Sequence, residues 1–509
     1  MADRRRARRR ETTEETPKVA PRPPRLSYPP IEIISADQVE AIHQASLEIL
    51  RDTGMRVLSG DARALYRAAG AEVRDEVVRF DPGLIEEKMA LVPSTFRLEA
   101  RNPARSLTLG DGTVNFSAVS GPAFVECLDK GRRAGTYAEL CDFTKLVQSL
   151  DILHQDGGGG FEAMDIPAQR RHLGVYHAQI TLTDKNWAPW GLGRVRARDA
   201  LELAAISLGI SLDALTERVV FSCVINTNSP LTLDVPMADG LIELARHGQA
   251  NIITPFTLAG AMSPITLAGA IAQQNAEALA GIVLTQCVRP GVPAIYGGFT
   301  TNVDMRTGSP AFGTPEYMQA AQITGQMARR YGIPFRSSNT TAANCCDAQA
   351  AWESQMSLWG AVMGGASLVK HAAGWLGGGL VASFEKLMID ADLLAMTARY
   401  LAPPAVASAD LAVDAIADVG PGGHFFGTAH TLERYKSAFH EPMLSDWSNY
   451  ETWSEAGSLT TAERANGAWK AMLKAYEPPP LDAGIREAVD AYCDRRGREI
   501  DAGIGVPEI

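Results

Sequence analysis

From about residue 114 onward, the chain repeats one pattern: a short apolar run, a loop rich in Gly, Ser, Asn and Thr, and a stretch with helical periodicity. Short apolar runs between helical stretches are typical of buried strands in a parallel sheet. The eight runs are 114–120, 150–156, 186–192, 219–226, 251–260, 293–299, 334–339 and 366–374. The pattern therefore predicts eight strand–helix units.

The helical stretches carry start and stop signals of their own. Thr314 precedes Pro315, which is typical of an N-cap and a first helical position, and Gly332 is a typical helix end. Asp347 is a favourable N-cap for the helix that follows it. Eight such units predict a (β/α)8 TIM barrel, an α/β fold whose active site lies at the carboxyl ends of the strands.

A doubly wound open sheet is the alternative fold. It would place a GxGxxG phosphate loop after the first strand, and the chain has none there. The GGGG at 157–160 lacks the Lys-Ser/Thr pair of a phosphate loop. We therefore divide the chain into four parts: a disordered basic tail (1–30), an N-terminal α+β elaboration (31–112), the barrel (113–401), and a C-terminal helical and loop extension packed on the barrel (402–509).

Composition and charge exclude several classes of protein. The 509 residues are 46% hydrophobic and carry a net charge of -11, which argues against a nucleic-acid partner. No run of about 20 apolar residues predicts a membrane span, and the arginines near the start precede no apolar segment of a secretory signal. Seven scattered cysteines without C-x-x-C spacing predict reduced thiols and no metal site. We expect a cytoplasmic protein.

The ends of the apolar runs, where a barrel would place its site, are rich in aromatic residues and poor in carboxylates. This mixture does not suit metal hydrolysis or glycoside cleavage, but aromatic faces bind quaternary ammonium groups, which cannot donate hydrogen bonds. Arg336 could bind a carboxylate at the other end of such a ligand. The candidate aromatic cage residues are Trp190, Phe256, Tyr296, Phe335 and Trp375. Phe335 would face outward if its neighbour Arg336 faces inward.

Four segments, at 347–354, 371–396, 422–444 and 476–485, resemble the trimethylamine methyltransferase family, and the resemblance covers residue 33 to the end. It implies a (β/α)8 barrel and transfer of a methyl group from an amine to the cobalt of a separate corrinoid protein. No cofactor is then bound directly. Archetypal members carry pyrrolysine just ahead of the segment that resembles DAQAAWES. Here the loop reads NTTAANCC, which resembles the non-pyrrolysine branch, whose members demethylate glycine betaine and similar quaternary amines.

The chemistry gives a reason why members without pyrrolysine would act on quaternary amines. A quaternary ammonium releases a neutral amine, so no general acid is required, and the enzyme needs only to position the methyl group and exclude water. We therefore expect a methyltransferase that moves a methyl group from a betaine-type amine to Co(I). Arg336 and His371 are the expected carboxylate ligands, with Asn344 and Gln349 as polar support. No residue is assigned a catalytic role.

Two alternatives stay open: a tertiary-amine methyltransferase that acts without pyrrolysine, and a non-catalytic betaine-binding protein. The expected partners are a corrinoid protein, a small quaternary amine and further copies of the same chain in a homo-oligomer. Cys345 and Cys346 lie where the resemblance places pyrrolysine. We interpret them as polarisable side chains that fill that space, and not as nucleophiles.

Overall fold

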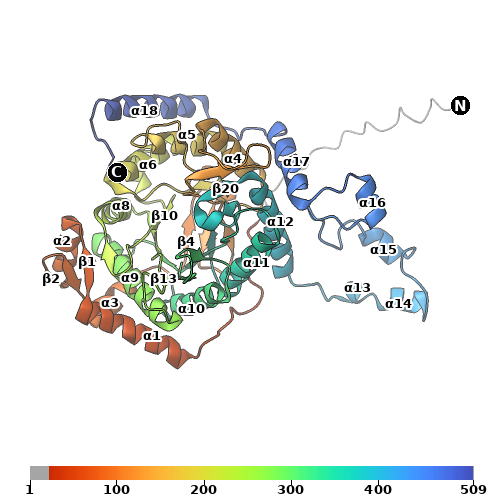
Figure 1. Ribbon diagram of the computed structural model, residues 1–509, viewed down its shortest axis with the longest axis horizontal. Coiled ribbons are helices and arrows are strands. Elements are labelled where there is room, and N and C mark those ends of the chain that lie inside the picture. The colour runs from red at the N-terminus through yellow and green to blue at the C-terminus, as the bar shows by residue number, and fades with distance from the viewer. Residues whose placement is uncertain (1–21, 508–509) are drawn as a thin grey trace.

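The computed structural model describes residues 22–507 and has a mixed α/β fold, with a parallel sheet at the centre and helices around it (Figure 1). The central sheet has six strands in the order β10-β12-β14-β17-β18-β6, and every neighbouring pair is parallel. Its strands are β10 (Ser222–Ile225), β12 (Ala250–Ile253), β14 (Ala294–Gly297), β17 (Phe335–Ser338), β18 (Leu368–Lys370) and β6 (Asn115–Phe116).

Two further strands, β8 (Gln155–Asp156) and β9 (Asn186–Trp187), pair in parallel with each other. An isolated parallel bridge between Ser117 and Gln155 links this pair to the β6 edge of the central sheet. Between β9 and β10 the described residues show no ladder, although the Asn186 side-chain amide donates to the Val220 carbonyl oxygen at 2.8 Å. All eight apolar runs thus contain a strand, and six of these strands form the continuous sheet.

A helix follows each of these eight strands, as the repeated pattern predicted. The predicted caps are confirmed: Thr314 and Asp347 accept backbone N–H bonds in the first turns of their helices, and Gly332 ends its helix with a φ of 65°. The eight helices are α4 (Tyr137–Ser149), α5 (Arg171–Leu182), α6 (Gly193–Leu208), α8 (Val235–Arg246), α9 (Leu267–Val288), α10 (Pro315–Tyr331), α11 (Ala348–Met363) and α12 (Phe384–Leu401).

Small elements decorate the connections between the strands and helices of this core. A short helix, α7 (Leu212–Leu215), precedes β10. The loops that lead from a central strand to the next helix hold the others, which therefore shape the carboxyl edge of the sheet. They are β7 (Phe124–Glu126), β11 (Thr232–Leu233), β13 (Leu258–Ala259), β15 (Thr301–Val303), β16 (Pro310–Ala311), β19 (Trp375–Leu376), the 3-10 turn η3 (Gly377–Gly379) and β20 (Val381–Ser383).

The N-terminal part combines helices with two small sheets. Its elements are α1 (Ala36–Glu48), η1 (Ile49–Thr53), β1 (Met55–Val57), α2 (Gly60–Ala68), β2 (Glu72–Arg74), β3 (Val77–Arg79), α3 (Pro82–Met89), β4 (Phe96–Leu98), η2 (Pro103–Arg105) and β5 (Leu107–Leu109). The β4–β5 hairpin packs three leucines, Leu98, Leu107 and Leu109, against Ile252, Ile295 and Leu368 of the central strands. The hairpin therefore closes the sheet at the end opposite the strand-to-helix loops.

The ordered chain begins earlier than the sequence predicted. Residues 22–30, included above in the disordered tail, run along the body: Val114 N–H donates to the Pro24 carbonyl, and Leu26 N–H donates to the Gly112 carbonyl. These hydrogen bonds pair the backbone of residues 24–26 with the backbone of residues 112–114, so the ordered chain begins before the predicted boundary at residue 31. Residues 1–21 of the predicted tail lie outside the described part of the chain.

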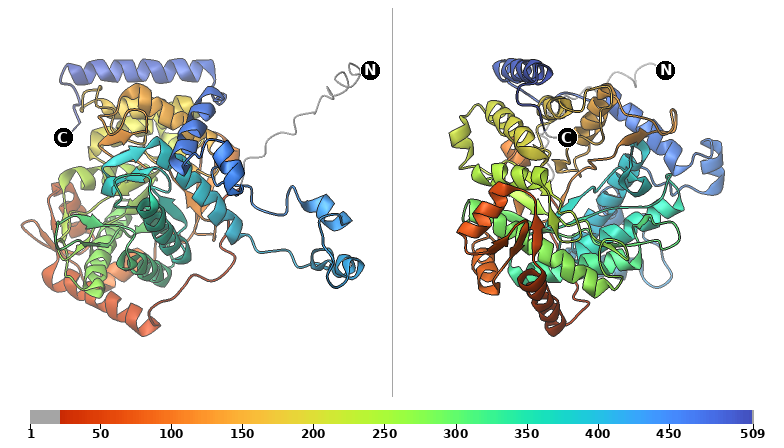
Figure 2. Two further views of the ribbon diagram at one scale, coloured as in Figure 1. Left: turned by 45° about the vertical axis from the view of Figure 1, so that its right-hand side comes forward. Right: turned by 60° about the vertical axis from the view of Figure 1, so that its left-hand side comes forward.

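The C-terminal extension has two different parts. α17 (Thr461–Lys474) packs on α12, and α18 (Ala483–Asp501) packs on α5 and α6. Residues 402–459, in contrast, project from the body (Figure 2). They contain α13 (Ser408–Leu411), α14 (Val413–Val419), α15 (Ala429–Arg434) and α16 (Tyr450–Glu455). The extension was predicted to pack on the core as a whole, and only its later part does so. No helix within residues 22–507 is long and apolar enough to cross a membrane.

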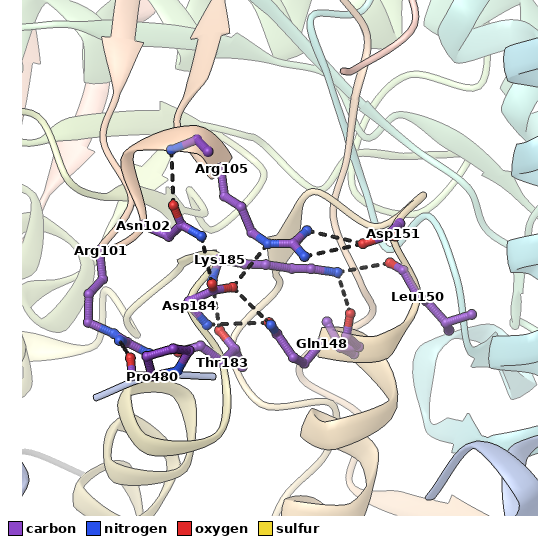
Figure 3. A network of polar contacts seen from close by, with 12 residues as sticks. Arg101, Asn102, Arg105, Gln148, Leu150, Asp151, Thr183, Asp184, Lys185 and Pro480 are labelled. Carbon is purple, nitrogen blue, oxygen red and sulfur yellow. Dashed lines mark hydrogen bonds and ion pairs between the residues drawn. The ribbon is translucent and has the colours of Figure 1, made fainter. Parts of the chain in front are cut away.

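A polar network joins the C-terminal extension to the closed end of the sheet (Figure 3). Asp184 accepts hydrogen bonds from Asn102 at 2.7 Å and Gln148 at 2.9 Å, and it pairs with Arg105 at 3.0 Å. Arg101 donates to the carbonyls of Thr183 and Pro480. These contacts hold the segment before β9 in place and lie away from the strand-to-helix loops.

Candidate active site

A cavity of about 560 Å³ lies at the carboxyl ends of the central strands, where the predicted fold would place a site. Its walls come from the loops that follow the strands. The side chains that define its chemistry are Trp190, Asn226, Phe256, Phe299, Arg336, Lys370, His371 and Trp375. No Asp or Glu is among the lining residues, so the charges at the cavity wall are cationic.

Arg336 reaches the cavity from β17 and is only 1% exposed. Its guanidinium lies 5.2 Å from the Phe299 ring centroid, and burial lowers the pKa of Arg336 to about 10. Its Nε and one terminal nitrogen have no hydrogen-bond partner among the described residues. A buried guanidinium with free donors is costly, and an anionic ligand would satisfy it.

His371 lies next to Arg336, directly after β18. Its Nδ1 is 3.5 Å from an Arg336 terminal nitrogen and 3.2 Å from Ser338 Oγ. Burial, with Arg336 and Lys370 nearby, keeps the pKa of His371 well below its ordinary value, so the ring is neutral. Because arginine only donates, Nδ1 is the acceptor and Nε2–H is left as a donor. The φ of 53° at His371 is strained for a residue with a side chain, as is common at functional sites.

Lys370 is a cavity residue that the sequence reasoning missed. Its Nζ donates to the Gly157 carbonyl at 3.1 Å and to Ser117 Oγ at 3.3 Å, and the side chain is 1% exposed. Burial and the nearby Arg336 lower the pKa of Lys370 to about 7. A lysine inside the otherwise apolar run 366–374 was the signal that could have identified it. Together with Arg336, it gives the cavity two basic side chains, of which Arg336 carries the full charge at neutral pH.

Aromatic rings form the other wall of the cavity. The Phe256 and Phe299 ring centroids are 5.2 Å apart, and Trp375 lies 6.1 Å from Phe299 and 4.6 Å from His371. Trp190 donates from Nε1 to the Gly158 carbonyl and Trp375 to the Thr341 carbonyl, both at 3.1 Å. These bonds fix the indole planes. Trp190, Phe256 and Trp375 of the predicted cage thus lie at the cavity, and Phe299 joins them.

Tyr296 and Phe335 do not reach the cavity. The Tyr296 hydroxyl donates to Asn275 Oδ1 on α9 at 2.6 Å, on the helix-facing side of the sheet. Phe335 faces a different hollow, lined by residues such as Tyr28 and Pro30. It precedes the inward-facing Arg336, and successive strand residues point to opposite faces. Both rings are therefore packing residues between the sheet and the helices.

Asn344 and Gln349 are exposed and do not line the cavity. Gln349 lies in the first turn of α11, and its amide donates to Glu353 Oε1 at 2.8 Å. Glu353 in turn accepts from the Ala342 and Ala343 backbone N–H groups. In this structure the pair supports the loop that leaves β17.

Cys345 and Cys346 also lie outside the cavity. Cys345 is exposed beside Asp347, which raises the pKa of the Cys345 thiol. Burial raises the pKa of Cys346 to about 12. Both cysteines therefore stay protonated near neutral pH, and a thiol is a far poorer nucleophile than a thiolate.

Two buried carboxylates hold the loops that carry the site. Glu277 on α9 accepts from Ser229 Oγ at 2.8 Å and from Leu231 N–H at 2.9 Å, which fixes the loop after β10. Asp390 on α12 accepts from Gly374 N–H at 2.9 Å and pairs with Lys386. Gly374 lies between His371 and Trp375 in the same loop, so this ion pair sets the position of both rings.

The loops around the cavity share one further feature. Each of the eight segments from a central strand to the first two turns of the next helix exposes one large apolar side chain, with exposed fractions between 37% and 68%. We call these the rim residues: Leu128, Met164, Leu192, Val235, Ile265, Met305, Trp352 and Leu380. All eight lie on the segments at the carboxyl edge of the strands, and Leu192 also lines the cavity. Exposed apolar side chains on several loops at one edge are typical of a surface that another macromolecule covers.

Comparison with known proteins supports a methyltransferase. The family described as Trimethylamine methyltransferase (MTTB) matches residues 1–501. A glycine betaine methyltransferase of Desulfitobacterium hafniense (strain Y51) is 36% identical, over 93% of this chain and 98% of that protein. The trimethylamine methyltransferase MttB of Desulfitobacterium hafniense (strain DSM 10664 / DCB-2) is 28% identical, over 91% and 94%.

A solved structure of the Methanosarcina barkeri monomethylamine methyltransferase superposes with a TM-score of 0.46 at 11% identity, covering 87% of this chain and 93% of that one. The family match spans nearly the whole chain, and the 36% identical relative is matched over almost its full length. The chain therefore belongs to the trimethylamine methyltransferase family and is a methyltransferase.

Proposed function

We propose that this methyltransferase takes its methyl group from a betaine, a quaternary amine that also carries a carboxylate. The observation that carries the proposal is the cavity wall: the buried Arg336 has free donors, and the lining residues include no carboxylate. A substrate without an anionic group, such as trimethylamine or choline, would leave the Arg336 guanidinium uncompensated. The relative named glycine betaine methyltransferase supports the same choice.

In this proposal the substrate lies with its two ends on different walls. The carboxylate accepts hydrogen bonds from Arg336 and from His371 Nε2–H, and the ammonium lies against Trp190, Phe256, Phe299 and Trp375. Each aromatic contact would contribute about 0.5–2 kcal/mol. Among these four residues the only side-chain N–H groups are the two indoles, and both are bound to carbonyls.

The reaction asks little of the protein beyond positioning. The bond from nitrogen to the methyl carbon breaks, and its electron pair stays on nitrogen as a neutral tertiary amine. No general acid is needed for this leaving group. The corrinoid of a partner protein supplies the nucleophile that takes up the methyl group. The residues of this chain orient the methyl group toward the cavity mouth and exclude water.

The rim residues are the surface we assign to the corrinoid protein. The cavity has the size of a small-molecule site, so the methyl acceptor has to approach from outside. Eight exposed apolar side chains on the strand-to-helix segments suit an acceptor that covers this edge of the sheet and keeps water out. The assignment rests on the position of the rim residues at the carboxyl edge of the strands and on their apolar character. A partner that docks there would contact several of the strand-to-helix loops.

We also infer that the eight strands form a (β/α)8 barrel. The strands follow one another in chain order, β8–β9 bridges to β6, and each strand precedes a helix. Among the described residues, the junction between β6 and β8 has one isolated bridge, and the junction between β9 and β10 has no backbone ladder. An experimental structure with substrate bound would show whether these junctions close.

The test is methyl transfer to a Co(I) corrinoid protein from a matched panel of amines. We expect glycine betaine to exceed choline, which has a hydroxyl in place of the carboxylate, by at least about tenfold. Charge-assisted hydrogen bonds contribute roughly 1.5–3 kcal/mol each, which supports that ratio. Arg336→Met should remove most of the preference. Tyr296→Phe is the control, because this aromatic residue on the same sheet does not line the cavity.

The outcomes separate the three readings. Faster transfer from trimethylamine than from any betaine would favour a tertiary-amine methyltransferase. Tight betaine binding without transfer would identify a binding protein on an inherited fold. A choline rate equal to that of glycine betaine would refute the role of Arg336 and His371 in carboxylate recognition.

A further inference from the structure

Residues 402–459 form an arm that leaves the body after α12 and returns at α17 (Figures 1 and 2). The body holds this arm mainly near its end. Asp392 accepts from Met443 N–H at 2.7 Å and from the Leu444 and Ser445 N–H groups at 3.3 Å. Leu444, at 4% exposed, is the one buried residue within the arm, all of which the structure describes.

The arm has no core of its own. Its four helices, α13 to α16, have four to seven residues each, and helices this short are unstable in water without tertiary packing. Its apolar side chains face outward instead of inward. Phe426 is 87% exposed, Phe439 83%, Trp447 74% and Tyr450 71%.

The exposed area is too large for a free surface. Each aromatic side chain offers about 150–250 Å², so these four leave roughly 500–800 Å² of mostly apolar surface uncovered. Monomeric proteins rarely expose a contiguous apolar patch of more than a few hundred Å². One side of a standard stable interface buries about 800 Å². The arm by itself therefore offers nearly one side of such an interface.

The composition of the arm favours a protein occupant. It holds eight Asp and Glu residues against one Arg and one Lys, which would repel nucleic acid and anionic lipid surfaces. The body exposes apolar side chains at the root of the arm: Met396 is 48% exposed and Tyr400 57%, both in the last two turns of α12.

We propose that the arm packs on a second copy of this chain, and that two copies exchange arms about a two-fold axis near the end of α12. In such a pair the same surface serves both sides, so each arm covers the Met396–Tyr400 patch of the other copy. The exchange would bury both arms and both roots at once, and it would give the short helices the packing that they lack.

The test is the mass of the purified full chain by sedimentation over a concentration series. We expect two copies for the natural chain. The triple variant Phe426→Ser, Phe439→Ser, Trp447→Ser should sediment as one copy, with at least a tenfold weaker association. The control is Ile265→Ser with Met305→Ser, two rim residues that are 68% and 66% exposed, and it should stay at two copies. The substituted arm residues are mostly exposed, so the body should keep its melting temperature.

Cross-linking gives a second readout that does not depend on the variants folding. Lys436 is the single lysine of the arm. In a mixture of isotope-labelled and unlabelled chains, we expect amine-reactive links from Lys436 to lysines of the other copy. A single-copy mass at every concentration, an unchanged mass in the triple variant, or Lys436 links only within one copy would overturn the proposal. Association seen only after addition of the corrinoid protein would overturn it as well, and would assign the arm to that partner.

Discussion

The ion pair between Lys386 and Asp390 offers a sharp test of how the site is held together. Both side chains are at most 1% exposed, and Lys386 also donates to Ser354 Oγ at 2.7 Å. Burial raises the pKa of Asp390, against the opposing effect of Lys386. The Asp390 carboxylate also accepts from Gly374 N–H in the loop of His371 and Trp375. A change to this pair should therefore lower both stability and substrate binding.

The magnitude follows from leaving one charge without its partner. Lys386→Met or Asp390→Asn should each lower the free energy of unfolding by about 3–5 kcal/mol, because the remaining charge is buried and unpaired. The double variant removes both charges, and the amide oxygen that Asp390→Asn introduces can still accept from Gly374. We expect it to cost only about 1–2 kcal/mol, since neutral replacement of a buried pair is often tolerated. The two sites should therefore be strongly coupled.

Urea unfolding of the four proteins measures this coupling in a double-mutant cycle. Methyl transfer from glycine betaine, measured in parallel, should show a raised KM in each single variant and recovery in the double variant. Single variants that each cost less than about 1 kcal/mol, or a double variant equal to their sum, would refute the reasoning. The pair would then be solvated or already neutral in the folded protein.

Three further predictions concern other parts of the chain. Burial lowers the pKa of His154 to about 3, so the unfolded chain binds a proton below about pH 6.5 that the folded chain refuses. His154 alone should lower the free energy of unfolding by up to about 1.4 kcal/mol per pH unit as the pH falls from about 6.5 toward 3, and His154→Asn should remove that part of the loss in urea titrations. Gly325→Ala would place a Cβ directly against the Gly364 carbonyl oxygen at the end of α11 and should lower the melting temperature, whereas Gly467→Ala, with open space, should raise it slightly. Replacing Cys345 and Cys346 with Ser should leave methyl transfer unchanged. Loss of activity with an intact fold would contradict the conclusion that these protonated thiols take no part in the reaction.

The rule that sites lie at strand ends predicted several of the residues that line the cavity. Arg336 and His371 were singled out as polar residues within or after apolar runs. In the structure, a terminal nitrogen of Arg336 lies 3.5 Å from Nδ1 of His371. Trp190, Phe256 and Trp375 lie at the cavity with them. These residues come from four different loops, and the repeated strand–helix pattern was enough to bring those loops to one edge.

Three of the predicted residues, Tyr296, Phe335 and Gln349, do not line the cavity, because of the direction in which their side chains point. Tyr296 and Phe335 lie on central strands, but their side chains face the helices, because a strand sends alternate residues to opposite sides. Gln349 lies in a helix that leads away from the cavity. Lys370 was overlooked although a lysine within an apolar run is itself a signal, and the groups that accept its hydrogen bonds come from segments far away in the sequence.

The sequence by itself determined the order of strands and helices, the helix caps and the family, because periodicity and capping are local properties. Only the tertiary structure decided which side chains share the cavity, that its lining residues include no carboxylate, and that residues 402–459 stand away from the body. Those features depend on contacts between segments far apart in the chain. Burial by such contacts lowers the pKa values of Arg336 and Lys370. The same contacts determine how much space surrounds the aromatic rings of the cavity, and a local sequence pattern does not contain this information.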